Sequence, residues 1–313
     1  MQDVTIIVNP VAGSGHAREL VTGFRARVRG AGYNCTIVTT TDADDLTRQV
    51  EQHTAAGRLV AIGGGDGTIR AALVGVKLGS TAPLMLLPLG TENLLATQLG
   101  ILPDLDLLWA TFSAGRSTPF DLALVNGQPV ATVVGAGFDA EVVARLAAER
   151  RGHITHLDYF WPLWRTFWEY KFPPIRVIAD GEEISNEPAL VFVGNIPRYA
   201  IGLQILREAR WDDGKLDLCI MRCSHQGPLI GHAFWTFLNW HVEHPWVIYR
   251  QVERVRLESS EPLPMQCDGD PAGNLPADIE IIPAAVRFIV PPETAAAAAT
   301  SLADRSADQS PPA

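Results

Sequence analysis

The feature that most constrains the fold is a glycine-rich stretch, Gly63-Gly64-Gly65-Asp66-Gly67-Thr68. The apolar run Leu59–Ile62 before it predicts a buried strand, and the residues after it predict a helix. Without Cβ atoms, successive N–H groups can point into one concavity close to a ligand, and such a nest at a helix N-terminus suits phosphate. Asp66 adds a hard oxygen, which favours a Mg²⁺-bound nucleotide. A tight strand-to-helix turn is the alternative for the glycine run taken alone.

Three other predicted strands end in loops of the same character, which strengthens the nucleotide interpretation. The strands and loops are Val4–Val8 with Asn9-Pro10 and Gly13-Ser14-Gly15, Cys35–Val38 with Thr39-Thr40-Thr41, and Pro83–Leu89 with Gly90-Thr91-Glu92-Asn93. Alternating strands and helices predict an α/β domain with a doubly wound parallel sheet, which binds ligands at the carboxyl ends of its strands. No P-loop pattern with its lysine occurs.

The pattern changes after Gly115, where β-branched runs predict a mainly antiparallel β domain. Asn126-Gly127 between two such runs predicts a two-residue hairpin turn, and further strands are expected as far as Val290. We therefore expect a nucleotide-binding domain at 1–119, a β domain at 120–292 and a poorly ordered tail at 293–313. The G-x-G-x-x-A match at Gly135–Ala140 lies beyond the hairpin, so a close turn into a helix is favoured over a dinucleotide site.

Composition limits the partners. The 313 residues carry a formal net charge of -10, which disfavours nucleic acid. No apolar run reaches the roughly 20 residues of a transmembrane segment, and four cysteines without paired spacing fit a reduced, cytoplasmic setting. Contact with an anionic membrane would have to rest on apolar insertion or a local basic patch.

Two aromatic stretches, Tyr159–Phe172 and Phe234–Tyr249, each allow two interpretations. In the first, Trp161, Trp164 and Trp168 recur at helical spacing, which favours a helix packed on the β domain. The alternative is a lipid-facing surface, because tryptophan favours the membrane interface. Two H-x-x-H pairs lie near these stretches, His153 with His156 and His241 with His244. We favour separate surface or capping histidines over a metal site.

Two polar turns complete the set of candidate sites. Trp211–Leu218 predicts a turn into a strand, with Asp213 and nearby carbonyls as the alternative of a cation site. Cys267-Asp268-Gly269-Asp270 places two carboxylates around a glycine. A turn alone explains Asp-Gly. If this turn faces the nucleotide loops, one carboxylate can accept a hydroxyl proton during phosphoryl transfer.

Taken in order, these motifs resemble the diacylglycerol kinase catalytic family, whose relatives include sphingosine and ceramide kinases. The resemblance covers nearly all of residues 1–292 and rests on the glycine loops, on Gly90-Thr91-x-Asn93, on Asp213-Gly214-Lys215-Leu216 and on Asp268-Gly269-Asp270. It implies an N-terminal nucleotide domain, a C-terminal β-sandwich and ATP in the cleft between them. The implied reaction is Mg²⁺-dependent transfer of the γ-phosphoryl group to a lipid hydroxyl, most simply that of diacylglycerol.

The resemblance also implies roles for individual residues. ATP would be bound by Asn9, Pro10, Gly13, Thr40, Gly64, Gly65, Asp66, Gly67, Thr68, Thr91 and Asn93. A structural Mg²⁺ would be held by Asp213 with the carbonyls of Arg210 and Lys215. The general base is expected at Asp270, where the commoner residue of the family is Glu, and Leu94 stands where many bacterial members carry Asp.

Two other functions fit parts of the pattern. An NAD kinase also contains Gly-Gly-Asp-Gly-Thr, although this gives no role to the turns at Asp213 and Asp268. The other is a nucleotide-binding regulatory protein without catalysis. Asp270 and Leu94 suggest this alternative, because both depart from the commoner residues of the family. The sequence does not distinguish among lipid substrates. We expect a cytoplasmic protein that meets its lipid peripherally at the membrane, and an edge strand of the β domain could pair across a two-fold axis to make a homodimer.

Overall fold

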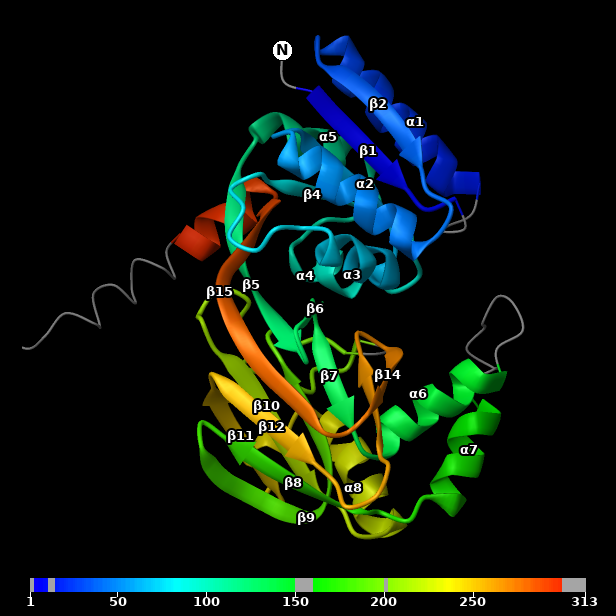
Figure 1. Ribbon diagram of the computed structural model, residues 1–313, viewed down its shortest axis with the longest axis vertical. Helices are drawn as coiled ribbons and strands as arrows, with labels where there is room; N and C mark the ends of the chain where they lie inside the picture. Colours follow the sequence, from blue (N-terminus) through cyan, green and yellow to red (C-terminus); the bar gives the residue numbers. More distant parts are fainter. Residues whose placement is uncertain (1–2, 11–14, 150–159, 200–201, 300–313) are drawn as a thin grey trace, which may run out of the picture. The chain divides into compact units, whose positions relative to one another are not determined.

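The structure is a computed structural model that describes residues 3–10, 15–149, 160–199 and 202–299 (Figure 1). It divides into two compact units, and each is described by itself. The first unit contains the chain up to Leu122, the short segment Trp211–Gly214 and the chain from Ile282 onward. The second unit contains Ala123–Arg210 and Lys215–Ile281. Strands β5 (Ser117–Val125) and β15 (Ala277–Ile289) contribute residues to both units.

The first unit is a parallel sheet covered by helices, as the alternating pattern predicts. The sheet has the order β2-β1-β3-β4, and the end of β15 joins β4 in parallel at Phe288. Every residue of β3 and β4 is buried, so both faces of the sheet are covered. Helix α1 packs with α5, and α2 packs with α3. The elements are β1 (Asp3–Val8), α1 (Gly15–Gly30), β2 (Asn34–Thr39), α2 (Ala43–Ala55), β3 (Leu59–Gly64), α3 (Asp66–Val74), β4 (Leu84–Pro88), α4 (Leu94–Gln98) and α5 (Leu105–Ala114).

The second unit is built from antiparallel strands. Its main path is β14-β13-β7-β9-β8-β12-β15, and β10 pairs with both β9 and β11. The expected hairpin joins β5 to β6, with Asn126 and Gly127 at positive φ. The remaining strands are β6 (Gln128–Val130), β7 (Val133–Ala136), β8 (Pro174–Ala179), β9 (Glu182–Gly194), β10 (Leu216–Arg222), β11 (Val247–Val252), β12 (Arg254–Glu258), β13 (Pro264–Cys267) and β14 (Asp270–Asn274). The unit also holds α6 (Phe138–Glu149), α7 (Phe160–Glu169), α8 (Gln226–Phe237) and the 3-10 turn η2 (His241–Glu243).

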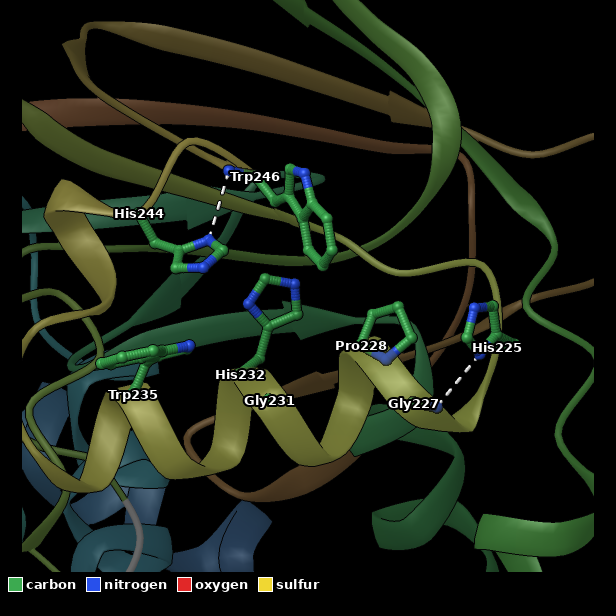
Figure 2. Close-up of a pocket in the computed structure, with 8 residues that line it drawn as sticks. All are labelled: His225, Gly227, Pro228, Gly231, His232, Trp235, His244 and Trp246. Carbon is green, nitrogen blue, oxygen red and sulfur yellow. Dashed lines mark hydrogen bonds between the residues drawn. The ribbon is translucent and has the colours of Figure 1, made fainter.

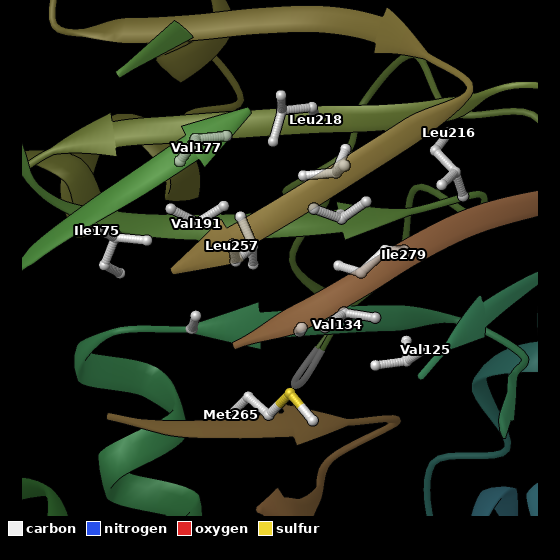
Figure 3. Packing of buried hydrophobic residues seen from close by; sticks show 14 of the residues in the cluster. Val125, Val134, Ile175, Val177, Val191, Leu216, Leu218, Leu257, Met265 and Ile279 are labelled. Carbon is white, nitrogen blue, oxygen red and sulfur yellow. The ribbon is translucent and has the colours of Figure 1, made fainter. Parts of the chain in front are cut away.

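Aliphatic side chains fill the interior of the second unit. Figure 3 shows them projecting from several strands into one cluster; among them are Val134, Val191, Leu218, Leu257 and Ile279. Alternate residues of β8 and β12 are buried, as expected of antiparallel strands with one face on a core. These features confirm the predicted fold class, an α/β domain followed by an antiparallel β-sandwich.

The structure differs from the sequence-based expectations in three places. The run Val252–Leu257, which predicts a single strand, spans the end of β11 and most of β12. The runs 279–282 and 286–290, which predict two strands, lie in the one strand β15. Residues 292–299 are helical, where the sequence predicts a poorly ordered tail. Alanine is a strong helix former, and the Thr294 hydroxyl donates to the Leu99 carbonyl at 3.1 Å, which anchors this helix. Among the residues described, no helix is both long and apolar enough to cross a membrane.

We predict that Gly75→Ala destabilises the first unit. A Cβ at residue 75 would lie 2.2 Å from the carbonyl oxygen of Thr47 in α2, so the contact between α2 and α3 would have to open. Overpacking of this kind costs about 1 to 3 kcal/mol of unfolding free energy. Gly30→Ala is the matched control, because a Cβ at residue 30 meets no atom within 4 Å. Urea unfolding should show a lower midpoint for the first variant only; equal midpoints would contradict the prediction.

Candidate functional site

The loops after β3 and β4 approach each other through backbone atoms alone. A Cβ on Gly90 would lie 2.6 Å from the Cα of Gly65, and one on Gly64 would lie 2.3 Å from the Thr68 side chain. The Leu89 amide donates to the Gly64 carbonyl at 3.0 Å and continues the pairing of the two strands into the loops. Side chains at these glycines would force the loops apart, so the close approach requires residues without Cβ atoms.

The ends of β1 and β2 lie at the same edge of the sheet, because Val8 is paired with both Thr39 and Gly63. The Asn9 amide donates to the Gly63 carbonyl at 3.1 Å, and the Asn9 side chain donates to the Thr68 hydroxyl at 3.3 Å. This brings the first glycine loop to the second. The predicted ligand Gly13 lies outside the described residues.

The other predicted nucleotide ligands differ in how exposed they are to solvent. Pro10, Gly67 and Thr91 are exposed, and Gly65 and Asp66 are half-buried. Thr40 is buried, and both its amide and its hydroxyl donate to the Val8 carbonyl. Thr40 therefore helps to hold the end of β1.

Two polar side chains shape the loop after β4. Asn93 is buried at φ 48°, accepts from the Gly90 amide at 2.9 Å and donates to the Gly90 carbonyl at 2.8 Å. Asp66, the first residue of α3, accepts from the Leu95 amide at 3.3 Å. Asn93 thus closes the loop after β4, and Asp66 joins the start of α4 to the N-terminus of α3.

These loops fit a phosphate-bearing ligand. They contain glycines at which a Cβ atom would meet neighbouring backbone or side-chain atoms, and α3 begins at this edge with an acidic first turn. Backbone N–H groups at a helix start bind phosphate, and the carboxylate can hold a bound cation. The residues present therefore suit a nucleotide with its divalent metal.

A buried carboxylate, Asp121, organises the polar turn Trp211–Gly214 of the first unit. It accepts from the Gly214 amide at 2.6 Å and from the Ala284 amide at 2.7 Å, while its own amide donates to the Trp211 carbonyl. Burial raises the pKa of Asp121, the two amides lower it, and the negative charges of Asp213 and Asp212 raise it further. A cation beside this group of carboxylates would offset their repulsion.

The cation ligands expected from the sequence lie on and beside this turn. Asp213 belongs to the turn, and Arg210 and Lys215 flank it in the chain. In the part of the chain that the structure describes, no group of three or more His, Cys, Asp or Glu side chains is arranged to hold a metal. A site here would therefore depend on Asp213 together with backbone carbonyls. No local pattern in the sequence points to Asp121, because its partners lie about 90 and 160 positions away.

The turn between β13 and β14 separates its two carboxylates into different roles. Asp268 is buried and accepts from the Ala131 amide at 3.0 Å, the Thr132 amide at 2.7 Å and the Thr132 hydroxyl at 2.6 Å. Asp270, the first residue of β14, is half-buried. Asp268 therefore anchors the turn, and Asp270 is the more exposed carboxylate of the pair.

Another carboxylate, the half-buried Asp139, lies in the G-x-G-x-x-A stretch that the sequence assigns to a close turn. Gly137, at φ 110°, makes that turn, and α6 follows from Phe138. The Tyr199 hydroxyl donates to Asp139 Oδ2 at 2.7 Å. Burial raises the pKa of Asp139 to about 6, against the lowering effects of Tyr199 and of the Gln266 side chain. The sequence analysis did not single out Asp139, because its partners are 60 or more positions away.

Helices α7 and α8 expose aromatic side chains on the second unit. Trp161 is 70% exposed and Phe237 is 77% exposed. The Gln226 side chain at the start of α8 donates to the Phe167 carbonyl of α7 at 3.1 Å, so the two helices touch. The aromatic surface is defined by Trp161, Leu163, Trp164, Trp168, Ile230, Phe234, Phe237, Trp240 and Trp246, all exposed. Phe167 instead packs on the buried cluster of this unit, so one face of α7 packs on the β domain as predicted, and another face exposes its tryptophans.

A cavity of 340 Å³ lies against α8 in the second unit (Figure 2). Its lining includes His225, His232, His244, Trp235 and Trp246. The buried His232 places Nε2 at 2.8 Å from the Arg222 carbonyl, so in the neutral ring Nδ1 is the acceptor. Nδ1 of His225 accepts a hydrogen bond from the Gly227 amide, and Nδ1 of His244 accepts one from the Trp246 amide. His153 and His156 lie outside the described residues, and His241 bonds the Ile205 carbonyl.

Comparisons with known proteins agree across the whole chain. Residues 3–125 match the family model of the diacylglycerol kinase catalytic domain, and residues 132–290 match that of the YegS C-terminal NAD kinase beta sandwich-like domain. The chain is 30% identical over 296 residues to a diacylglycerol kinase of Mycobacterium tuberculosis, covering 92% of this chain and 95% of the relative. It is 26% identical over 302 residues to one of Bacillus subtilis, covering 94% and 98%.

A solved structure shares the fold. A putative diacylglycerol kinase from Bacillus anthracis superposes with a TM-score of 0.77 at 24% identity, covering 93% of this chain and 98% of the other.

We predict that Asp139→Asn stabilises the chain at neutral pH. The pKa of the Asp139 carboxyl in the folded chain is about 6. This lies above the pKa of an aspartate in the unfolded chain, so the folded state binds the proton more tightly. The free energy of unfolding therefore falls as the pH rises from about 4 to about 6 and is lowest above 6. The amide removes this dependence and should add about 1 to 3 kcal/mol at pH 7.5. Urea unfolding should show a smaller gain at pH 5; equal gains at both pH values would contradict the assignment.

Proposed function

Because the chain belongs to the diacylglycerol kinase family and is a lipid kinase, we propose that it transfers the γ-phosphoryl group of ATP to a lipid hydroxyl. Diacylglycerol is the proposed acceptor, since both relatives described above are named for it. The observation that carries the proposal is the combination of glycine loops suited to phosphate with a half-buried carboxylate, Asp270, on an anchored turn.

In the proposed reaction the glycine loops hold the phosphates of ATP. Backbone N–H groups at the start of α3 bind phosphate oxygens, and Asp66 is placed to hold a metal ion bound to them. The glycines serve by letting the backbone approach the ligand closely. Phosphoryl transfer depends mainly on such positioning and charge stabilisation, because the protein has little covalent chemistry to perform.

We assign the general base to Asp270. Its carboxylate accepts the proton of the lipid hydroxyl, whose oxygen forms the new bond to the γ-phosphorus as the bond to the β-phosphate oxygen breaks. Asp268 supports this role from the opposite side of the turn, because its bonds to Ala131 and Thr132 fix the backbone that carries Asp270. Aspartate is one methylene shorter than glutamate, so the hydroxyl must come correspondingly closer to the backbone.

Magnesium has two proposed positions. One is with the nucleotide, beside Asp66. The other is structural, on Asp213 with the carbonyls of Arg210 and Lys215, where the repulsion among Asp121, Asp212 and Asp213 favours a bound cation. A divalent ion supplies charge neutralisation for the phosphates when bound.

We expect labelled phosphate to pass from ATP to diacylglycerol in mixed micelles with Mg²⁺, and to other lipids more slowly. Asp270→Asn should lower this transfer at least about a hundredfold while ATP affinity stays within about twofold, because the loss of a general base affects the chemical step. Asp66→Ala should instead weaken Mg-ATP binding. Transfer by Asp270→Asn at the wild-type rate would rule out this base. ATP binding without transfer to any lipid would contradict the kinase assignment of this site.

We also propose that the aromatic surface on α7 and α8 brings the enzyme to the bilayer. A lipid substrate lies in the membrane, and the net charge of -10 makes attraction to anionic lipid weak. Five tryptophans of the surface are exposed, and tryptophan favours the interface between headgroups and acyl chains. Apolar insertion is therefore the proposed mode of peripheral attachment.

The triple variant Trp161→Ala/Trp164→Ala/Trp168→Ala should bind zwitterionic phosphatidylcholine vesicles at least about tenfold more weakly than the wild type. It removes the apolar side-chain area that would be buried in the bilayer on binding. Its turnover of a short-chain, water-soluble diacylglycerol should stay unchanged. Leu102→Ala is the control, since Leu102 is an exposed apolar residue of the first unit that does not belong to the aromatic surface. Vesicle sedimentation measures the effect. Equal binding by the triple variant and the control would refute the proposed attachment.

A further inference from the structure

The cavity against α8 contains a buried hydrogen-bond acceptor, Nδ1 of His232. This side chain is only 2% exposed. Its Nε2 lies 2.8 Å from the Arg222 carbonyl, so in the neutral ring Nε2 carries the proton and Nδ1 is the acceptor. The part of the chain that the structure describes offers this Nδ1 no hydrogen-bond partner. A buried acceptor without a partner is costly and rare in folded proteins. A ligand that donates a hydrogen bond here would remove that cost.

A second histidine of the cavity supplies a donor. His244 Nδ1 accepts from the Trp246 amide at 3.3 Å, so in the neutral ring its Nε2 carries the proton. The centroids of the His232 and His244 rings are 6.1 Å apart, and Figure 2 shows the two rings facing each other above α8. One ring thus offers an acceptor and the other a donor. A hydroxyl group both donates and accepts, so a single hydroxyl can bind both rings.

Apart from its histidines, the cavity has apolar walls. Trp235, Trp246, Pro228 and two glycines line it, and none of the described lining residues is Asp, Glu, Lys or Arg. Burial lowers the pKa of His232, against the raising effect of its bond to the Arg222 carbonyl, and this favours the neutral ring. The cavity therefore suits an uncharged ligand with an apolar part. Its volume of 340 Å³ falls within the range of small-molecule sites, about 300 to 1,000 Å³.

The aromatic surface indicates where such a ligand comes from. Trp246 belongs both to the wall of the cavity and to the aromatic surface, and it is 53% exposed. Trp235 of the wall stacks on Trp240, another member of that surface, with ring centroids 6.2 Å apart. A lipid in a bilayer that touches the aromatic surface would therefore lie beside the cavity. The phosphatidylcholine headgroup has no hydrogen-bond donor for His232 Nδ1, whereas a lipid alcohol has one.

We propose that this cavity binds the alcohol end of an uncharged lipid. The hydroxyl donates to His232 Nδ1 and accepts from His244 Nε2, and the adjoining carbon chain lies along Trp235 and Trp246. The binding chemistry stands on the cavity itself, and only the bilayer as the source of the ligand rests on the membrane attachment proposed above. The cavity shares no lining residue with the glycine loops or with the turn of Asp270. It is therefore a second lipid site, separate from the residues assigned to phosphoryl transfer.

The first test titrates the full-length protein with 1-octanol and with its methyl ether, 1-methoxyoctane, by calorimetry. The ether has the same chain and no hydroxyl proton. It should bind the wild type at least about tenfold more weakly, because His232 Nδ1 then stays buried and unpaired. In His232→Phe, whose folding is checked by urea unfolding, the alcohol and the ether should bind with equal affinity. Equal affinities in the wild type, or no binding of the alcohol, would overturn the proposal.

Gly231 allows the cavity to be filled without a clash. It lies on α8, lines the cavity, and a Cβ at this residue would meet no atom within 4 Å. Leucine is also a better helix former than glycine, so Gly231→Leu should remain folded. It should bind 1-octanol at least about tenfold more weakly, because the new side chain occupies the site. Gly30→Leu is the matched control at an open position of α1 and should bind as the wild type does. Undiminished binding by Gly231→Leu would place the alcohol elsewhere and overturn the proposal.

Vesicles distinguish a lipid alcohol from a small soluble one. In sedimentation, phosphatidylcholine vesicles that contain oleyl alcohol should bind the wild type at least about threefold more tightly than phosphatidylcholine alone, because the cavity adds a second contact with the bilayer. Gly231→Leu should not show this gain. If 1-octanol binds in the cavity and the gain is absent, the lipid assignment is wrong. If the wild type binds neither kind of vesicle, the proposed membrane attachment fails, and the lipid assignment fails with it.

Discussion

The backbone contact between Gly65 and Gly90 is the constraint on which the candidate nucleotide site depends. The two loops leave neighbouring parallel strands, β3 and β4, and meet with a Cα of one loop where a side chain of the other would be. A Cβ at either glycine would push the loops apart. This would also move the start of α3 and strain the hydrogen bond from the Leu95 amide to the Asp66 carboxylate. The geometry of the candidate site is therefore a property of the whole sheet edge, set by the absence of side chains.

Buried carboxylates organise the turns that carry the other candidate residues. Asp121 gathers two amides from segments remote in sequence, and Asp268 binds the backbone at Ala131 and Thr132. A carboxylate that accepts several N–H groups is a strong organiser, because charge-assisted hydrogen bonds are about twice as strong as neutral ones. The chain thus uses negative charge to fix polar loops around its proposed chemistry.

The sequence predicted what is local and missed what is distant. Apolar runs and glycines predicted β1 to β4, and Asn126-Gly127 predicted the hairpin, because these patterns depend on neighbouring residues. The family resemblance was confirmed by the comparisons, whereas the roles of Asp270 and the loop residues remain predictions. The hydrogen bonds of Asp121 and Asp139 could not be predicted, since their partners come from segments that only the fold brings together. The joining of two predicted strands into β15 depends on the same kind of long-range pairing.

The path of β15 has a consequence for how the protein is made. This strand completes the parallel sheet beside β4, yet it lies some 200 residues later in the chain. Proteins fold from the N-terminus as they are synthesised. While the ribosome is still translating the second unit, β4 therefore has an unpaired edge, a surface prone to wrong association. The first unit therefore begins to fold first and is completed last, and a chain truncated before residue 282 should aggregate through the unpaired edge of β4.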